Sequence, residues 1–519
     1  MIYKGAAIDV PDIALTPFVL HRAAEFGDKP ALTDGVSGRS LTYGALADGV
    51  QRVGSALHAR GFKKGDVMAI LSPNLPEYPI AYFAVASLGG INTTINSLYT
   101  PREIADQLKD ARPRFLLTVP VFMDRAVEGS KGSSVEEIFV FGEAQGATPF
   151  AELMAQPGQM PDVDIDPSKD LVALPYSSGT TGLAKGVMLT HRNLVANLVQ
   201  FEQAQHIRDS DQVLGVVPFY HIYGMTVVMG GTLRSGATIV TMPRFELETF
   251  LRIMQDHHIT RAYLAPPIVV ALAKHPMVDK FDLSALDIVF SGAAPLDEKL
   301  ADACCQRLDC RILQGYGMTE ASPVTHLTRD DVEWEKVGSI GAVAAGTECK
   351  VVDIVSGADL DPGQDGEILI RGPQVMTGYL NNQAATEQIL DKDGWLHTGD
   401  IGHADEEGDF YVVDRLKELI KYKGFQVPPA ELEAILLTHP AVADAAVIPH
   451  ADEEAGEVPK AFVVLRSPVA PEELIAFVAE RVAPHKKIRL VETIDEIPKS
   501  ASGKILRRKL VERERAVKA

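Results

Sequence analysis

Cysteine is scarce in this chain. Four cysteines occur in 519 residues, at positions 304, 305, 310 and 349, and none forms a C-x-x-C pair. So few unpaired thiols exclude a disulfide scaffold and indicate reduced, mostly structural cysteines of a cytoplasmic protein. The first five residues also lack the apolar core of a signal peptide. Internal repeats and low-complexity segments are missing as well.

An excess of positive charge is also missing. The formal net charge is −20, which argues against broad binding to nucleic acid or to anionic membranes. The charge is uneven, because residues 415–519 carry 18 Lys and Arg against 16 Asp and Glu, whereas residues 1–414 carry 32 against 54. A slightly basic module on an acidic body suits a lid that brings cations to an anionic ligand. Two modules with merely different surfaces are the alternative.

A membrane span is not expected. The run 213–233 holds 21 residues without Lys, Arg, Asp or Glu, but it contains Pro218, His221 and four glycines. Such a composition fits a strand, a turn and a helix in a globular core better than a span.

The length exceeds what one hydrophobic core usually fills, so two or more domains are expected. Strand and helix patterns alternate over 41–117 and 211–313, which predicts parallel sheets covered by helices. Short strands and Gly-rich turns over 338–411 predict a smaller, mostly antiparallel subdomain. We therefore predict an α/β fold in which 1–414 form a large domain of two helix-covered sheets plus that subdomain. Residues 415–519 would form a small, mobile α+β lid.

Individual elements follow from apolar runs and their periodicity. Strands are predicted at 67–71, 115–119, 171–174, 187–189, 213–217, 237–241, 261–264, 287–290, 310–313, 443–448 and 460–465, and helices at 80–87, 429–438 and 471–482.

Residues 177–186 hold the strongest functional signal. Four hydroxyls, three glycines and Lys185 lie within these ten residues, between two predicted strands. Glycines let backbone N–H groups approach an anion, hydroxyls add donors and the lysine adds charge. The pattern predicts a polyphosphate cradle, although its spacing is neither that of the P-loop nor that of the dinucleotide fingerprint. A flexible surface turn is the alternative.

Three further segments carry polar chemistry beside glycines. Gln314–Glu320 directly follows a predicted strand, and ligands of parallel sheets bind beyond the carboxyl ends of the strands. The two glycines beside Tyr316 would let its ring lie flat on a nucleobase. Thr319 and Glu320 would offer oxygens to phosphate and Mg²⁺. Asp400 suits acceptance from two ribose hydroxyls. The cation-rich 414–426 at the presumed boundary suggests a hinge with ribose or phosphate contacts. Plain packing, a plain turn and a solvated basic helix are the respective alternatives.

The basic segment 498–508 lies near the end of the chain. Lys504 follows a glycine and precedes an apolar pair, as expected of a charge carried on a mobile but anchored loop. A frayed tail is the alternative.

With these five segments in this order, the chain resembles the adenylate-forming superfamily of acyl- and aryl-CoA synthetases, luciferases and adenylation domains. The similarity spans about 41–508, and segments 218–224, 366–372 and 421–427 are similar to the 4-coumarate–CoA ligase branch. The resemblance implies two steps. A carboxylate attacks the α-phosphorus of Mg·ATP to give an acyl-adenylate and pyrophosphate, and the thiol of coenzyme A then displaces AMP.

The resemblance also implies roles for individual residues. In the first step, the β/γ-phosphates would be bound by Ser177, Ser178, Gly179, Thr180, Thr181 and Lys185, and Mg²⁺ by Glu320. Adenine would be framed by Gln314, Gly315 and Tyr316, and ribose would be held by Asp400 and Arg415. Thr319 would contact the α-phosphate, and Lys504 would bridge the carboxylate and the α-phosphate. In the second step the lid would rotate about Lys417. Lys423, Gly424 and Arg244 would then meet CoA, while Lys421 and Gln426 would face AMP.

The same resemblance implies an acid pocket lined by His221, Tyr223, Val227, Gly292, Ala293, Gly315, Pro323 and Val324. His221 would act as a gate near the thiol path, or alternatively as a packed polar core residue. Val227 stands where hydroxycinnamate-using relatives often have a small polar residue, which leaves a mainly apolar slot. Apolar pockets separate related chains by only about 1–3 kcal/mol per methylene, so broad substrate use is expected.

The leading hypothesis is an ATP-dependent acid–CoA ligase acting on a cinnamate-like aryl acid or a medium-chain fatty acid, as a monomer or homodimer. A second hypothesis is an adenylating enzyme that passes its acyl group to an amine, a carrier protein or oxygen. A third is a non-catalytic nucleotide-binding regulator, which would require the loss of a charged site residue, and none is lost.

Overall fold

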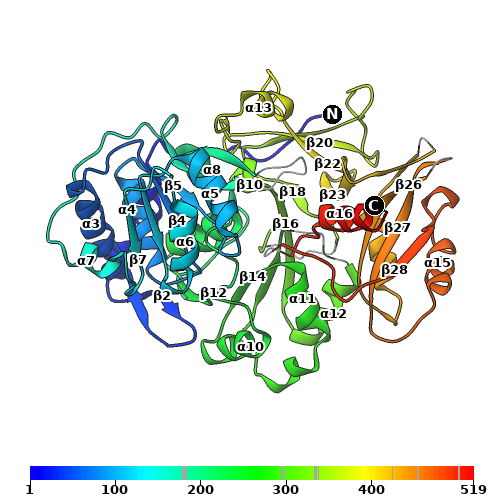
Figure 1. The fold of residues 1–519 in the computed structure, drawn as a ribbon, viewed down its shortest axis with the longest axis horizontal. Helices are drawn as coiled ribbons and strands as arrows, with labels where there is room; N and C mark the ends of the chain where they lie inside the picture. The colour runs from blue at the N-terminus through cyan, green and yellow to red at the C-terminus, as the bar shows by residue number, and fades with distance from the viewer. Residues whose placement is uncertain are drawn as a thin grey trace.

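A computed structural model of the chain describes residues 1–177, 184–293, 296, 298–331, 336, 338–423, 425–452, 455–500 and 503–518, with the backbone alone at 425–426 and 515–518. Its strands form three sheets (Figure 1). Two large sheets belong to the first four-fifths of the chain, and a smaller one is built from residues after 419. The α/β class is confirmed.

The largest sheet has 14 strands in the described part of the chain. In spatial order they are β1 (Tyr3–Lys4), β19 (Glu348–Val352), β20 (Gly366–Arg371), β22 (Leu396–Ala404), β23 (Asp409–Arg415), β18 (Gly341–Val343), β17 (Val324–Leu327), β16 (Arg311–Gly317), β15 (Ile288–Ser291), β14 (Arg261–Leu264), β12 (Gln212–Gly215), β13 (Thr238–Thr241), β2 (Pro30–Asp34) and β3 (Ser40–Thr42).

The pairing of this sheet changes from parallel to antiparallel at strand β16. Residues 311–314 pair in parallel with β15, whereas Gly315–Gly317 pair antiparallel with β17. The predicted antiparallel subdomain is therefore present, and it continues the hydrogen-bonded ladder of the parallel strands. The ends of the parallel strands consequently lie beside the first antiparallel strands, where a ligand site is expected.

The second sheet is mixed. Its strands are β10 (Tyr176–Ser177), β11 (Lys185–Thr190), β9 (Leu171–Ala173), β5 (Ile91–Thr94), β4 (Val67–Leu71), β6 (Phe115–Thr118), β7 (Glu137–Val140) and β8 (Thr148–Pro149), with β21 (Gly378–Tyr379) paired to β11. The strand β21 thus ties a late segment of the chain to the strand that carries Lys185.

One hydrophobic core joins the two large sheets. It includes Met68 of β4, Phe83 of α4 (Tyr78–Ser87), and Val213 and Ile239 of β12 and β13. Residues 78–86 of α4 are all buried, which explains why this helix is apolar on every side. Further helices are α1 (Leu15–Val19), α2 (Ala23–Phe26), α3 (Tyr43–Ala59), α5 (Pro101–Ala111), α6 (Met123–Ser130), α7 (Phe150–Ala155), α8 (His191–Glu202), α9 (Thr232–Ser235), α10 (Leu247–Asp256), α11 (Pro266–Lys274), α12 (Glu298–Leu308) and α13 (Gln383–Ile389).

The apolar run 213–233 lies inside this core. It forms β12, a turn, and a π-helical segment, η2 (Tyr223–Gly231), that leads into α9. A π-helix is rare and frequently occurs at functional sites. Among the helices of the described part, none combines the length and the apolar character that a membrane crossing requires.

The third sheet forms a separate unit, at the side of the molecule opposite β4 and β7 in Figure 1. Its strands are β25 (Phe425–Val427), β24 (Ile420–Tyr422), β27 (Gly456–Leu465), β26 (Val442–Asp452) and β28 (Leu490–Thr493). The helices α14 (Pro429–Leu437), α15 (Pro471–Ala479) and α16 (Arg507–Lys518) accompany it. Ile420, Leu432, Val447 and Val463 share one core within this unit.

Candidate functional site

The described ends of the predicted polyphosphate segment belong to two antiparallel strands, the β10–β11 hairpin. Ser177 at the end of β10 pairs with Lys185 at the start of β11. Ser178, Gly179, Thr180 and Thr181 lie outside the described residues. Ser177 and Lys185, which carry one hydroxyl and one ammonium, therefore stand on neighbouring strands.

Glu320 lies close to this hairpin. It belongs to the short 3₁₀ turn η4 (Thr319–Ala321), and its side chain is buried while Thr319 is half-buried. Tyr379 donates its hydroxyl to Glu320 Oε1 over 2.8 Å, and Lys185 Nζ lies 5.2 Å from the centre of the Tyr379 ring. Burial, reinforced by Glu320, raises the pKa of Tyr379 and keeps it protonated. Sequence reasoning missed Tyr379, because a Gly-Tyr pair before a turn carries no chemical signal.

Tyr316 lies within β16, and not in a loop after it. Gly315 is required there, because a Cβ at this position would lie 2.6 Å from Phe290 Cζ. The Tyr316 hydroxyl donates to Asp400 Oδ2 over 2.5 Å, and Arg415 Nε lies 3.0 Å from Asp400 Oδ1. The backbone N–H of the neighbouring Gln314 donates to the hydroxyl of Thr328, and that hydroxyl donates to the backbone carbonyl of Gln314.

Asp400 is almost fully buried, and burial raises its pKa while Arg415 and the Tyr316 hydroxyl oppose that rise. The predicted adenine and ribose residues Tyr316, Asp400 and Arg415 are thus brought together from three strands, β16, β22 and β23.

Lys504 approaches the same group from the third unit. Its loop contacts the body at Gly503, which has a φ of +80° and whose added Cβ would lie 2.8 Å from Pro267 at the start of α11. Burial, aided by the nearby Arg415, lowers the pKa of Lys504 to about 8, against the opposing effect of Glu418 and Asp400. An ammonium delivered next to Asp400 and Arg415 is placed to meet an anionic ligand.

The residues predicted for the acid pocket lie on η2 and on segments beside it. Tyr223 on η2 packs on Gly292 after β15, since a Cβ on Gly292 would lie 3.3 Å from the Tyr223 ring. The Tyr223 hydroxyl donates to the carbonyl of Phe290 over 3.1 Å, so the residue presents its ring while its polar end is already bonded. Val227 is fully buried on the same helix.

The remaining pocket residues lie on two other segments. Pro323 and Val324 are buried at the start of β17, where Val324 exchanges hydrogen bonds with Asn197 of α8. Ala293 is exposed and has a φ of +76°. The described pocket residues are therefore apolar apart from His221 and the bonded hydroxyl of Tyr223.

His221 precedes η2 and is partly buried. Its Nδ1 accepts the backbone N–H of Tyr223 over 3.3 Å, and desolvation lowers its pKa to about 4. The imidazole is therefore neutral at pH 7, with its proton on Nε2.

The lysines and the arginine assigned to the second step lie on exposed segments of the chain. Lys417 is exposed in the turn between β23 and β24, and Lys421 and Lys423 are exposed on the third unit. Arg244 is exposed after β13. Gly424 and the side chain of Gln426 lie outside the described residues.

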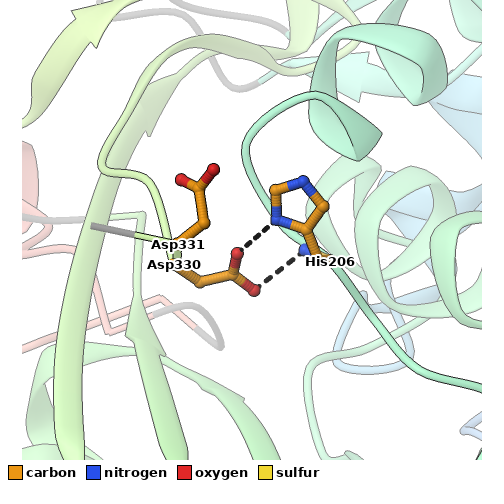
Figure 2. Close-up of side chains that lie close together, drawn as sticks. All are labelled: His206, Asp330 and Asp331. Carbon is orange, nitrogen blue, oxygen red and sulfur yellow. Dashed lines mark hydrogen bonds and ion pairs between the residues drawn. The ribbon is translucent and has the colours of Figure 1, made fainter.

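A second polar cluster lies elsewhere, on His206, Asp330 and Asp331. Figure 2 shows the two Asp330 oxygens facing His206, one toward the ring at 2.7 Å and one toward the backbone nitrogen at 2.8 Å. The buried Arg261 adds a bond of 2.9 Å to Asp330, and Asp331 pairs with Arg329. These partners account for both carboxylates, so we interpret the cluster as an ion-pair network that supports the fold.

Comparison with known proteins gives the family of the chain. The AMP-binding enzyme domain matches residues 19–380, and the AMP-binding enzyme C-terminal domain matches residues 431–504. The chain belongs to the AMP-binding enzyme family. Curated relatives include 4-coumarate–CoA ligase 5 of Oryza sativa subsp. japonica, 44% identical over 97% of this chain and 95% of the relative. Another is 4-coumarate–CoA ligase 2 of Petroselinum crispum, 42% identical over 98% and 96%.

Solved structures of similar proteins agree with the family. The anthranilate–CoA ligase AuaEII in complex with anthranoyl-AMP superposes with a TM-score of 0.89, at 27% identity over 98% of both chains. ATP-bound MatB from Rhodopseudomonas palustris has a TM-score of 0.87, at 27% identity over 97% of this chain and 100% of that protein. This chain is thus an AMP-forming acid–CoA ligase that works through an acyl-adenylate. An acyl acceptor other than CoA is not favoured.

Proposed function

We propose that this ligase activates a cinnamate-like aryl acid or a medium-chain fatty acid. The observation that carries the proposal is the apolar character of the residues predicted to line the acid pocket, where the Tyr223 hydroxyl is already bonded and Val227 is fully buried. Such a slot accepts a ring or an alkyl chain by burial, and its walls offer the acid no charged partner. The names of the 4-coumarate–CoA ligases support the aryl acid.

In the proposed first step, a carboxylate oxygen attacks the α-phosphorus and pyrophosphate leaves. A carboxylate is ionised at pH 7 and needs no general base, so the barrier comes from bringing anions together. We propose that Lys504 bridges the carboxylate and the α-phosphate, with Thr319 beside it. Its burial next to Asp400 and Arg415 supports this role.

We propose that the triphosphate lies along the β10–β11 hairpin. Ser177 and Lys185, together with Ser178, Gly179, Thr180 and Thr181, would bind its β/γ-phosphates, while Gln314, Gly315 and Tyr316 frame adenine and Asp400 and Arg415 hold ribose. Glu320 would hold Mg²⁺, and its buried carboxylate, which accepts a hydrogen bond from Tyr379, fits that ion. When bound, Mg²⁺ would neutralise phosphate charge.

In the proposed second step, the unit 415–519 rotates about the exposed Lys417 and withdraws Lys504 from the body 1–414. The CoA thiol then attacks the acyl carbonyl and AMP leaves. Lys423, Gly424 and Arg244 would meet CoA, Lys421 and Gln426 would face AMP, and His221 would gate the thiol path. The exposure of Lys421, Lys423 and Arg244 in the present arrangement supports a change of position between the steps.

A screen of carboxylic acids tests the substrate. Pyrophosphate release is followed with and without CoA, and the thioester is identified by mass. We expect cinnamate-like or medium-chain acids to give CoA-dependent AMP release and an acyl-CoA. A preference for short, charged dicarboxylic acids would contradict the apolar slot. Pyrophosphate release without any thioester would contradict the acceptor.

We also propose a cytoplasmic location and a monomeric or homodimeric state. The four cysteines are free thiols in the structure, which supports a reducing compartment. Light scattering during gel filtration distinguishes the two states by mass.

A further inference from the structure

The segment 376–380 forms hydrogen bonds both to strand β11 and to the turn η4. Its backbone N–H groups at Thr377 and Leu380 donate to the carbonyls of Met188 and Gly186 in β11, over 3.1 and 2.8 Å. The N–H of Met376 donates to the carbonyl of Glu320 over 2.9 Å. This short stretch therefore fixes the strand that carries Lys185 relative to the turn that carries Glu320.

Tyr379 lies at the centre of this stretch, on β21. Its side chain is 7% exposed, its hydroxyl donates to Glu320 Oε1 over 2.8 Å, and its ring faces Lys185 Nζ at 5.2 Å from the centroid. Its own backbone is held as well, because the N–H of Tyr379 donates to Thr386 Oγ1 of α13 over 2.9 Å. One rigid aromatic side chain thus contacts both the carboxylate and the ammonium.

We infer that Tyr379 is a positioning residue, whose hydroxyl orients the Glu320 carboxylate toward a divalent cation of the nucleotide and whose ring holds Lys185 beside it. The inference rests on the proposed role of Glu320. A carboxylate has about four lone-pair sites, and one hydrogen bond leaves the others for a metal. Partners behind a metal ligand typically contribute 10–100-fold to metal affinity.

Binding of a non-hydrolysable ATP analogue tests this role without turnover. The dissociation constant of β,γ-imido-ATP is measured by calorimetry with Mg²⁺ and with EDTA, and the ratio of the two is the magnesium gain. Tyr379→Phe removes only the hydroxyl, so we expect it to lower the gain about tenfold while leaving the affinity in EDTA nearly unchanged. An unchanged gain would overturn the inference.

A double-mutant cycle asks whether the hydroxyl acts through the carboxylate. Glu320→Gln should lower the gain at least as much as Tyr379→Phe, and adding Tyr379→Phe to Glu320→Gln should lower it no further. Equal effects of Tyr379→Phe in both backgrounds would show that Tyr379 acts independently of Glu320 and would overturn the inference.

Tyr43→Phe is the matched control. Tyr43 is also buried, and its hydroxyl donates to the carbonyl of Ala237 over 2.6 Å, far from the hairpin in sequence and outside the site. This variant should keep the wild-type gain, so a fall there would assign the effect to lost stability and overturn the inference. If Tyr379→Phe fails to fold, Thr386→Val removes the acceptor of the Tyr379 N–H and should lower the gain severalfold; a wild-type gain in Thr386→Val would then contradict the role.

The same measurements distinguish a failure of the proposed metal role of Glu320 from a failure of the inference about Tyr379. A wild-type protein with equal affinity in Mg²⁺ and EDTA, or a Glu320→Gln variant with the full gain, would remove the metal role of Glu320 and with it the inference about Tyr379. A normal gain in wild type, lost in Glu320→Gln and kept in Tyr379→Phe, would remove the inference alone.

Discussion

Asp400 and Arg415 face each other across the β22–β23 pair, and Arg415 Nε lies 3.0 Å from Asp400 Oδ1. The other Asp400 oxygen accepts the hydroxyl of Tyr316 from β16. One buried carboxylate therefore fixes both the ring and the guanidinium that we assign to the nucleoside of ATP. The negative charge of Asp400 pairs with the guanidinium of Arg415, and in the proposed mechanism it also accepts from ribose.

Asp400→Asn should raise the KM for ATP about 10–100-fold, because a hydrogen bond to a charged group contributes roughly 1.5–3 kcal/mol. The measurement is the initial rate of pyrophosphate release against ATP concentration. Asp365→Asn is the control, since Asp365 is exposed and pairs with His403 at 2.7 Å. A wild-type KM in Asp400→Asn would contradict the ribose assignment.

Several elements of the fold could be predicted from the sequence. The predicted strands at 67–71 and 261–264 match β4 and β14, because a short, largely apolar run between turns has few other solutions. The apolar run predicts a strand that ends at 313, whereas β16 extends to Gly317. The sequence Gln-Gly-Tyr-Gly is typical of a loop, and the hydrogen bonds to β17 that keep it extended come from residues about ten positions away.

Contacts between distant segments could not be predicted. Tyr379 lies 59 residues from Glu320 in the chain, and neither residue's neighbours signal the hydrogen bond between them. The π-helical form of η2 was also missed, since apolar periodicity predicts a helix without specifying its hydrogen-bond step. The roles assigned to residues 178–181, to Lys417 and to the CoA-facing residues stay predictions.

Lys504 provides a test by proton uptake. Its pKa of about 8 leaves it near half-protonated at pH 8, and a bound triphosphate favours the charged form and raises that pKa. Lys504 should therefore contribute about half a proton of uptake when ATP binds at pH 8, and this contribution should vanish near pH 6.5, where the ammonium is already formed.

Calorimetry in two buffers of different ionisation enthalpy measures the protons taken up. Lys504→Ala should take up about half a proton less than wild type at pH 8 and the same number at pH 6.5, whereas Lys509→Ala, at an exposed lysine of α16, should match wild type at both. Lys504→Ala should also slow adenylation on the order of 10²–10³-fold. Equal proton uptake at pH 8 by wild type and Lys504→Ala would contradict the placement of this ammonium at the nucleotide.

Gly503 tests the contact between the Lys504 loop and the body. Gly503→Ala places a Cβ 2.8 Å from Pro267 and requires a left-handed backbone that costs roughly 1–2 kcal/mol for other residues. We expect adenylation to slow about tenfold in single-turnover measurements. Gly357→Ala isolates the backbone cost, because Gly357 has a φ of +70° with no atom within 4 Å of the added Cβ. Equal rates in the two variants would argue that Gly503 does not contact the body during the reaction.

Lys417 tests the hinge. It is exposed, and within the described residues its backbone N–H has no hydrogen-bond partner, so proline at this position breaks no bond of the present arrangement. Lys417→Pro fixes one backbone angle and should hinder rotation. Thioester formation from supplied acyl-adenylate should fall at least tenfold, while pyrophosphate release changes little. Unimpaired CoA turnover would exclude rotation at this residue.

Arg261 tests the contribution of a buried ion-pair network to stability. It is 3% exposed and binds Asp211 and Asp330, each at 2.9 Å, and both carboxylates are equally buried. Arg261→Met would leave two buried carboxylates without their guanidinium, which costs about 3–5 kcal/mol. Denaturant unfolding followed by tryptophan fluorescence should show the transition at lower denaturant. Arg252→Ala removes an exposed ion pair with Glu248 and should cost under about 1 kcal/mol. If Arg261→Met unfolded at the wild-type midpoint, the ion pairs of Arg261 with Asp211 and Asp330 would not support the fold as we interpret them.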